Sequence, residues 1–124
     1  DIPGLTNYTS DYGTGYGATN TDQFYGSQNT TNIVAITSAG QGGYHAAARY
    51  CDRLNYGGYT DWHLPNRFEL NLVYTNRASL SGLDTSGNWY WSSTEISNYG
   101  SWIQSFSDGG QDYGNKSLGT DCVV

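Results

Sequence analysis

The fold is decided by the stretch PNRFELNLVY, residues 65–74, which carries the signals that begin a helix and give it a buried side. Asn66 follows a proline and can cap the helix, and Glu69 stands at the third helical position, where a carboxylate completes a capping box. Leu70 and Val73 then recur at helical spacing on one face. The stretch predicts a capped helix with an apolar inner face, and it assigns Glu69 to stability rather than to ligand binding.

An earlier helix is predicted from Tyr44 to Leu54, where Ala47 and Cys51 fall on one apolar face at helical spacing. Residues 33–36, Ile-Val-Ala-Ile, have the composition of a short buried strand. Residues 1–32 are rich in Gly, Asn, Thr and Tyr and follow no lasting period, so we expect an irregular arm there.

After Gly82 the chain takes on β character. Strands are predicted at residues 89–93 and 102–107, which are rich in aromatic residues, and residues 122–124 form a terminal strand. The Asp-Gly-Gly run at residues 108–110 is a turn signal. The order of these elements predicts an α+β domain in which two helices pack on one curled antiparallel sheet with long loops.

The length and composition of the chain indicate how many domains it forms and how its surface is charged. A chain of 124 residues is long enough for one core, so we expect a single domain over residues 1–124 with its core in residues 33–124. Only 13% of the residues are charged, and the net charge is −6. Nucleic acid is bound through clustered Lys and Arg, which are scattered here, so nucleic acid is not an expected partner. The chain lacks methionine and starts at Asp1, which we interpret as a mature or excised module.

The two cysteines, Cys51 and Cys122, lie far apart in the chain and form no C-x-x-C pair. The two histidines do not complete a usual zinc set with them. Both cysteines lie on apolar segments, so a long-range disulfide is predicted, with free buried thiols as the alternative. Such a disulfide would indicate an oxidising compartment.

An ordered set of motifs runs through most of the chain. It consists of GYTDWHLP at residues 58–65 followed by Glu69-Leu70, YWSSTE at 90–95, SWIQSFSDG at 101–109 and DCV at 121–123. This set resembles a bacterial domain family best known as the C-terminal domain of a collagen-like adhesin. Two positions depart from the family pattern, because His63 and Asp121 stand where members usually have arginine.

The resemblance implies a C-type-lectin-like fold, related also to sulfatase-modifying-factor domains. It further implies display outside the cell, on bacterial surface proteins, pilus tips or phage fibres. The collagen-like adhesin binds sulfated glycosaminoglycans. Because this chain lacks the two arginines, sulfated glycans are not the expected ligand here.

Most residues of the shared motifs are expected to be scaffold. Asp61 is interpreted as a turn residue, and His63 as a partly buried imidazole whose hydrogen bonds are satisfied. The aromatic and aliphatic members fall at core-facing spacings. Those assigned to structural roles are Trp62, Leu64, Leu70, Trp91, Trp102 and Phe106.

The residues from Glu95 to Ser117 are the ones least readily assigned to structural roles. They include amides, carboxylates and aromatic rings of the kind that bind sugars. A merely soluble loop is the alternative. Asp112 and Tyr113 are expected to be essential, and the ligand should be neutral or cationic, so that its affinity changes little with salt. The predicted ligand-binding residues are Trp89, Glu95, Asn98, Tyr99, Asp108, Gln111, Asp112, Tyr113, Asn115 and Lys116.

Motifs of catalysis and metal binding are absent from the sequence, including G-x-S-x-G, H-E-x-x-H, the phosphate loop and the calcium loop. We therefore expect no enzyme, no metal site and no cofactor, although calcium bound without a recognisable motif stays open.

Three hypotheses of function follow. The first is an extracellular adhesin module at the tip of a bacterial appendage such as a pilus, which binds a cell-surface glycan or another receptor without catalysis. The second is a structural cap of a surface or phage fibre, a homotrimer held by an upstream stalk, with no ligand of its own. The third is an enzyme related to the sulfatase-modifying fold. A membrane would be reached only through a parent protein.

Overall fold

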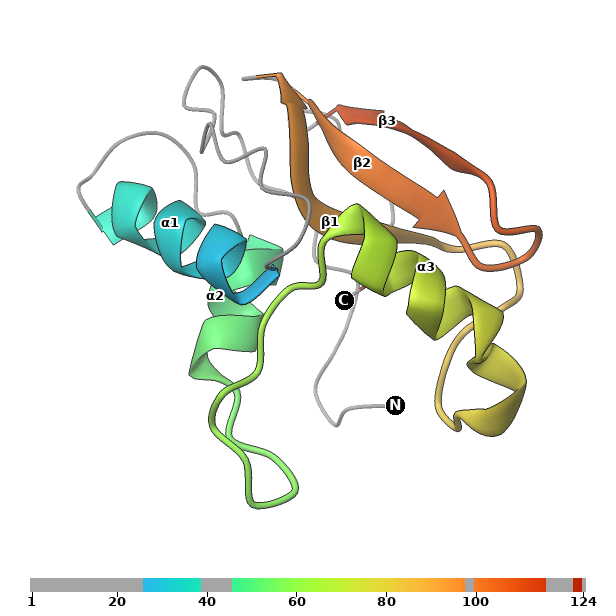
Figure 1. Cartoon of the computed structure of the whole chain (residues 1–124), viewed down its shortest axis with the longest axis horizontal. Coiled ribbons are helices and arrows are strands. Elements are labelled where there is room, and N and C mark those ends of the chain that lie inside the picture. Colours follow the sequence, from blue (N-terminus) through green and yellow to red (C-terminus); the bar gives the residue numbers. More distant parts are fainter. Residues whose placement is uncertain (1–25, 39–45, 98–99, 116–121, 124) are drawn as a thin grey trace.

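The computed structural model describes residues 26–38, 46–97, 100–115 and 122–123, which form helices and a sheet (Figure 1). The helices are α1 (Gly26–Ser38), α2 (Ala46–Arg53) and α3 (Arg67–Thr75), with a 3₁₀ turn η1 at Arg77–Ser79. The strands are β1 (Trp89–Ser97), β2 (Gly100–Ser105), β3 (Gln111–Asn115) and β4 (Cys122–Val123). The predicted α+β class is confirmed, with three helices in place of two among the described residues.

The strands form one sheet in the order β3-β2-β1-β4. The β1–β2 and β2–β3 pairs are antiparallel, whereas β4 runs parallel to β1. The prediction of a wholly antiparallel sheet is therefore wrong at its last strand. The strand β4 lies at the edge opposite β3, so no hairpin connects it to its neighbour and imposes the antiparallel direction.

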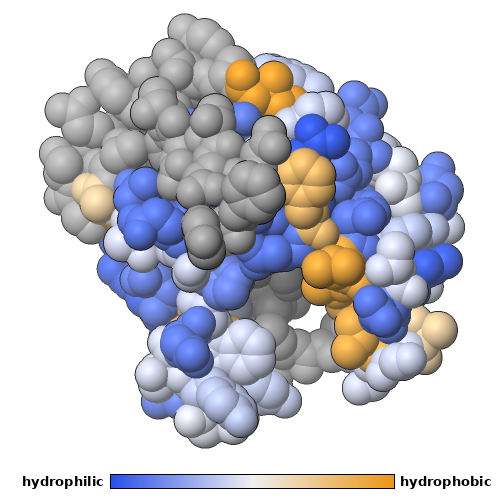
Figure 2. Space-filling view, in the orientation of Figure 1, coloured by the Kyte–Doolittle hydropathy of each residue, from blue (hydrophilic) through white to orange (hydrophobic). Residues whose placement is uncertain are grey.

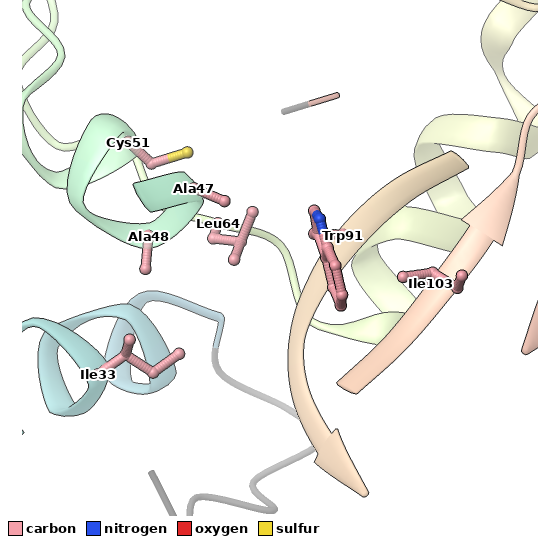
Figure 3. Packing of buried hydrophobic residues seen from close by; sticks show 7 residues of the cluster. All are labelled: Ile33, Ala47, Ala48, Cys51, Leu64, Trp91 and Ile103. Carbon is pink, nitrogen blue, oxygen red and sulfur yellow. The ribbon is translucent and has the colours of Figure 1, made fainter. Parts of the chain in front are cut away.

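Side chains alternate across β1 and β2, so the sheet has a hydrophobic core on each face. On one face Trp91 and Ile103 pack with residues of α1 and α2, and we call this group the α1–α2 cluster. On the other face Tyr90 and Phe106 pack with Leu70 of α3, and we call this group the α3 cluster. Figure 3 shows the α1–α2 cluster, which comprises Ile33, Ala47, Ala48, Cys51, Leu64, Trp91 and Ile103.

The helix α1 occupies residues that were predicted to be partly irregular and partly a strand, and that prediction is wrong. The inner side of α1 is largely polar, because Asn29 and Thr30 are fully buried. The Thr30 hydroxyl accepts a hydrogen bond from Leu64 N at 2.9 Å, and Asn29 Nδ2 donates to Ser93 Oγ at 3.3 Å. A helix that docks through buried polar side chains has no apolar stripe, so hydrophobic periodicity does not reveal it.

The predicted turn at residues 108–110 is confirmed, and it joins β2 to β3. Gly109 N donates to Ser105 O, and Gly109 has φ +83°, a conformation that favours glycine. The strand β3, which follows the turn, was predicted to be part of a loop. Its sequence QDYGN is polar, as exposed edge strands often are, and backbone pairing with β2 rather than an apolar pattern makes it a strand.

Cys51 is a free thiol in the structure, so the predicted disulfide with Cys122 is not formed there. Cys51 is only 5% exposed and belongs to the α1–α2 cluster, where it packs as a small apolar residue. Burial raises the pKa of this thiol to about 12, so it is protonated at neutral pH.

None of the described helices is both long enough and apolar enough to cross a bilayer.

Candidate functional site

An aromatic hairpin projects from the described part of the chain between α2 and α3 (Figure 1). The backbones of Tyr56 and Tyr59 donate to each other, with both N···O distances at 3.1 Å. Gly57 and Gly58 form the turn with φ values of +63° and +83°, the left-handed pair that a tight two-residue hairpin needs. The turn therefore holds two tyrosines side by side, and their rings are 46% and 64% exposed.

Trp62 is fixed against this hairpin. Its Nε1 donates to the carbonyl oxygens of Tyr56 at 3.3 Å and of Tyr59 at 3.1 Å. The ring stands edge-on to the Tyr59 ring, with centroids 6.4 Å apart. Trp62 is nevertheless 38% exposed, so the prediction that it faces the core is wrong. Its polar edge is bonded to the hairpin while part of the ring stays open to solvent.

An open cleft of about 500 Å³ lies between the hairpin and α3. The space-filling view shows a hollow beside the projecting hairpin, with hydrophobic residues along its α3 side (Figure 2). The lining combines aromatic, aliphatic and acidic side chains, namely Tyr59, Asp61, Trp62, His63, Pro65, Glu69 and Val73. The cleft thus offers an exposed aromatic face together with two carboxyl groups.

Glu69 ties together the segments that form the floor of the cleft. Its backbone N–H donates to Asn66 Oδ1 at 2.7 Å, which confirms Asn66 as the cap of α3. Its carboxylate accepts a hydrogen bond from Gly26 N at 2.7 Å, and its other oxygen lies 2.8 Å from His63 Nε2. His63 is therefore a partly buried imidazole with a partner, as predicted. The Glu69 carboxylate does not return to the backbone of Asn66, so the reciprocal half of the predicted capping box is wrong, and the side chain fixes the first residue of α1 instead.

Replacing Glu69 by alanine should lower the free energy of unfolding by about 1–3 kcal/mol, because the N–H of the buried residue Gly26 would lose its acceptor. Urea unfolding of the variant measures this loss. Asp61→Ala is the matched control, since Asp61 is an exposed carboxylate on the same cleft, and it should change stability by less than about 0.5 kcal/mol. Equal losses in the two variants would contradict the linking role of Glu69.

The ligand-binding residues that were predicted between Trp89 and Lys116 lie in different parts of the structure. Trp89 packs against the α1–α2 cluster, and Glu95 is buried in β1. Asn98, Tyr99 and Lys116 lie outside the described residues. Asn115, at the end of β3, is partly buried.

The remaining predicted residues lie along the β2–β3 hairpin. Asp108 is in the turn, where its carboxylate accepts a hydrogen bond from Gly110 N at 3.0 Å, and this bond lowers the pKa of Asp108. Along β3, Gln111 and Tyr113 share one face of the sheet, and Asp112 lies on the other. Asp112 and Tyr113, predicted to act together, therefore point to opposite sides of an edge strand.

The family model described as the Lcl C-terminal domain matches residues 9–123, nearly the whole chain. The chain belongs to this family. The predicted resemblance to the C-terminal domain of a collagen-like adhesin is thereby confirmed. A search of curated proteins found no match to the chain.

In this Lcl C-terminal domain the shared motifs are bonded to one another. Ser93 N, in the motif YWSSTE, donates to Pro65 O at 2.8 Å, at the end of DWHLP. Just beyond this contact, Arg67 N donates to Thr94 Oγ1 at 2.9 Å. Leu64 is buried between these contacts and α2. The motifs therefore act as scaffold, as predicted, and they hold Trp62 and His63 at the cleft.

Sequence reasoning missed the cleft because Trp62 was assigned a core-facing, structural role. The signal was present, since Tyr56-Gly57-Gly58-Tyr59 is a hairpin pattern with aromatic residues on both sides of two glycines. What the pattern does not contain is the position of Glu69 and Val73 beside the hairpin, which depends on how α3 packs on the sheet.

Proposed function

We propose that this Lcl C-terminal domain is a non-catalytic recognition domain of a bacterial surface fibre, displayed outside the cell, and that its cleft binds a neutral sugar. Family membership suggests the association with surface fibres. The family resemblance also supports a C-type-lectin-like fold, with which the observed α+β arrangement is compatible.

The observation that carries the proposal is the exposed, immobilised ring of Trp62 beside Asp61 in an open cleft. An aromatic ring already held in place binds an apolar face at little cost in conformational entropy. A carboxylate is a strong acceptor for hydroxyl groups. Sugars present both an apolar C–H face and pairs of hydroxyl groups, so the two side chains complement one ligand class.

The carboxyl groups of the cleft support binding rather than catalysis. The Glu69 carboxylate is engaged by Gly26 N and by His63, so its oxygens serve the scaffold. Asp61 is a single exposed carboxylate, so it has no second free carboxyl group beside it in the cleft. A glycosidase needs a pair of carboxyl groups of which one is held protonated near neutral pH.

Trp62→Ala should weaken the binding of a neutral sugar by about tenfold or more, because the stacking surface is lost. A glycan array with the isolated chain identifies the sugar, and titration calorimetry then compares the variants. Asp61→Asn should also weaken binding while leaving stability unchanged, which separates recognition from folding. Leu72→Ala is the control, since Leu72 is 62% exposed and does not line the cleft.

Two results would contradict the proposal. The first is a neutral sugar whose affinity survives both Trp62→Ala and Asp61→Asn. The second is a folded chain that binds no glycan on the array, which would favour a structural cap. The affinity should also change little between low and physiological salt, because a neutral ligand releases few counterions.

A further inference from the structure

A second surface, on the other side of α3 from the cleft, carries an arginine that is held rigidly. The Arg67 guanidinium lies over the Trp102 ring of β2, with Cζ 3.7 Å from the ring centroid. It also lies 5.3 Å from the Phe68 ring centroid. Aromatic contacts of this kind favour a guanidinium strongly over an ammonium group. The Trp102 ring thereby covers a flat face of the Arg67 guanidinium.

Hydrogen bonds to Gln111 restrict the rotation of the Arg67 side chain further. Arg67 Nε donates to Gln111 Oε1 at 3.2 Å, while Gln111 Nε2 donates to the backbone oxygen of Arg67 at 2.8 Å. The Gln111 amide thus bonds Arg67 at both ends and sets the plane of the guanidinium. The two Nη groups make no hydrogen bond or ion pair with any residue that the structure describes. Their four N–H donors form the edge that recognises planar anions in two-point contacts.

Another exposed aromatic residue, Tyr113, lies on the same face of the sheet as Trp102. Tyr113 pairs with Trp102 across β2 and β3, and its ring is 44% exposed. The ring lies over Gly100, where an added Cβ would come within 1.9 Å of Tyr113 Cε2. Because Gly100 has no side chain, the Tyr113 ring can lie over the backbone of β2.

We propose that this surface, which we call the Arg67 platform and define as Arg67, Trp102, Gln111 and Tyr113, binds the carboxylate of an acidic sugar residue. The open Nη edge matches the two oxygens of one carboxylate, and the Tyr113 ring offers a stacking surface for the attached sugar ring. The net charge of −6 repels a polyanion, so a ligand with a single negative group suits this protein better.

The Arg67 platform is independent of the cleft. Glu69 and Val73 line the cleft, whereas Arg67 and Asn71 face β2 and β3, where Gln104 Nε2 donates to Asn71 Oδ1 at 2.8 Å. The proposal therefore adds a second ligand class to the proposed function, and either site can be wrong without the other.

The test is a titration of the whole chain with sodium glucuronate, followed by NMR at the indole N–H of Trp102 and of Trp62. Glucuronate should shift the Trp102 signal, and glucose should leave it in place. Sodium acetate should shift the same signal at higher concentration, because it carries the carboxylate without the ring. An acidic tripeptide is the fourth probe.

Arg67→Gln should weaken glucuronate binding by about tenfold or more, and Arg67→Lys should also weaken it, because lysine keeps the charge but not the two-point edge. The matched control is Arg77→Gln. Arg77 stacks on Tyr74 in the same manner, 3.9 Å from the ring centroid, but lies outside the platform.

An unchanged glucuronate affinity in Arg67→Gln would overturn the proposal, as would an equal loss in Arg77→Gln. Stronger binding of the acidic peptide than of glucuronate would also overturn it, in favour of a protein partner. Binding of neutral sugars at Trp62 tests the cleft alone, so failure of one site is distinguishable from failure of the other.

Discussion

Replacing Phe106 by alanine should lower the free energy of unfolding by about 3–5 kcal/mol, the largest effect expected of any single substitution in the α3 cluster. Phe106 is 1% exposed, and its ring centroid lies 4.2 Å from that of Tyr90 and 5.6 Å from that of Tyr74. Removal of the ring would leave a cavity between β1 and α3 that neither tyrosine can fill without leaving its own contacts. Urea unfolding followed by far-ultraviolet circular dichroism measures the loss.

The chain provides a matched control for this substitution. Phe68 lies on α3 but is 49% exposed, so Phe68→Ala removes the same atoms from a site that is already half in water. It should cost less than about 1 kcal/mol. A loss in Phe106→Ala no larger than that in Phe68→Ala would mean that the α3 cluster is not a close-packed core.

The stability of the protein should fall as the pH rises from about 9 to about 12, because of Cys51. Burial raises the pKa of this thiol from 9.0 to about 12 in the folded state, whereas the unfolded chain releases the proton near pH 9. Between these values the folded state binds more protons, so stability is fully present below pH 9 and is lost as the pH rises. A shift of this size corresponds to roughly 4 kcal/mol.

Urea unfolding at several pH values, with and without Cys51→Ala, isolates this contribution. Burial also raises the pKa of Tyr90, and both chains retain that residue, so the difference between them reports on Cys51 alone. The wild type should lose more stability than Cys51→Ala over this range. Parallel curves would contradict a free thiol at Cys51, and they are what a disulfide at this position would produce, since a bonded sulfur does not titrate.

Local signals in the sequence were sufficient to predict several elements of the structure. The cap of α3 was predicted from Asn66 and Glu69, because a cap needs only the residues of the first helical turn. The turn at residues 108–110 was predicted in the same way, from glycines that accept a left-handed backbone. The family motifs were long and correctly ordered, and they led to the family without any structure.

The candidate site was predicted less well, for a reason that β3 illustrates. Gln111, Asp112 and Tyr113 are neighbours in the sequence and were grouped as a loop. As a strand they alternate, so Gln111 and Tyr113 lie on the side of Arg67 while Asp112 lies on the other. Whether a polar segment becomes a strand depends on an edge that can pair with it, which the segment itself does not contain.

The sequence by itself determined the α+β class, the capped third helix, the β2–β3 turn and the family, because each depends on residues close together in the chain or on a pattern read along it. Only the tertiary structure decided the helical state of α1, the free thiol of Cys51 and the two surfaces on either side of α3. Buried polar contacts such as Leu64 N to Thr30 Oγ1 join residues 34 positions apart. Their free energy exists only once the chain has brought those residues together, and no local propensity encodes it.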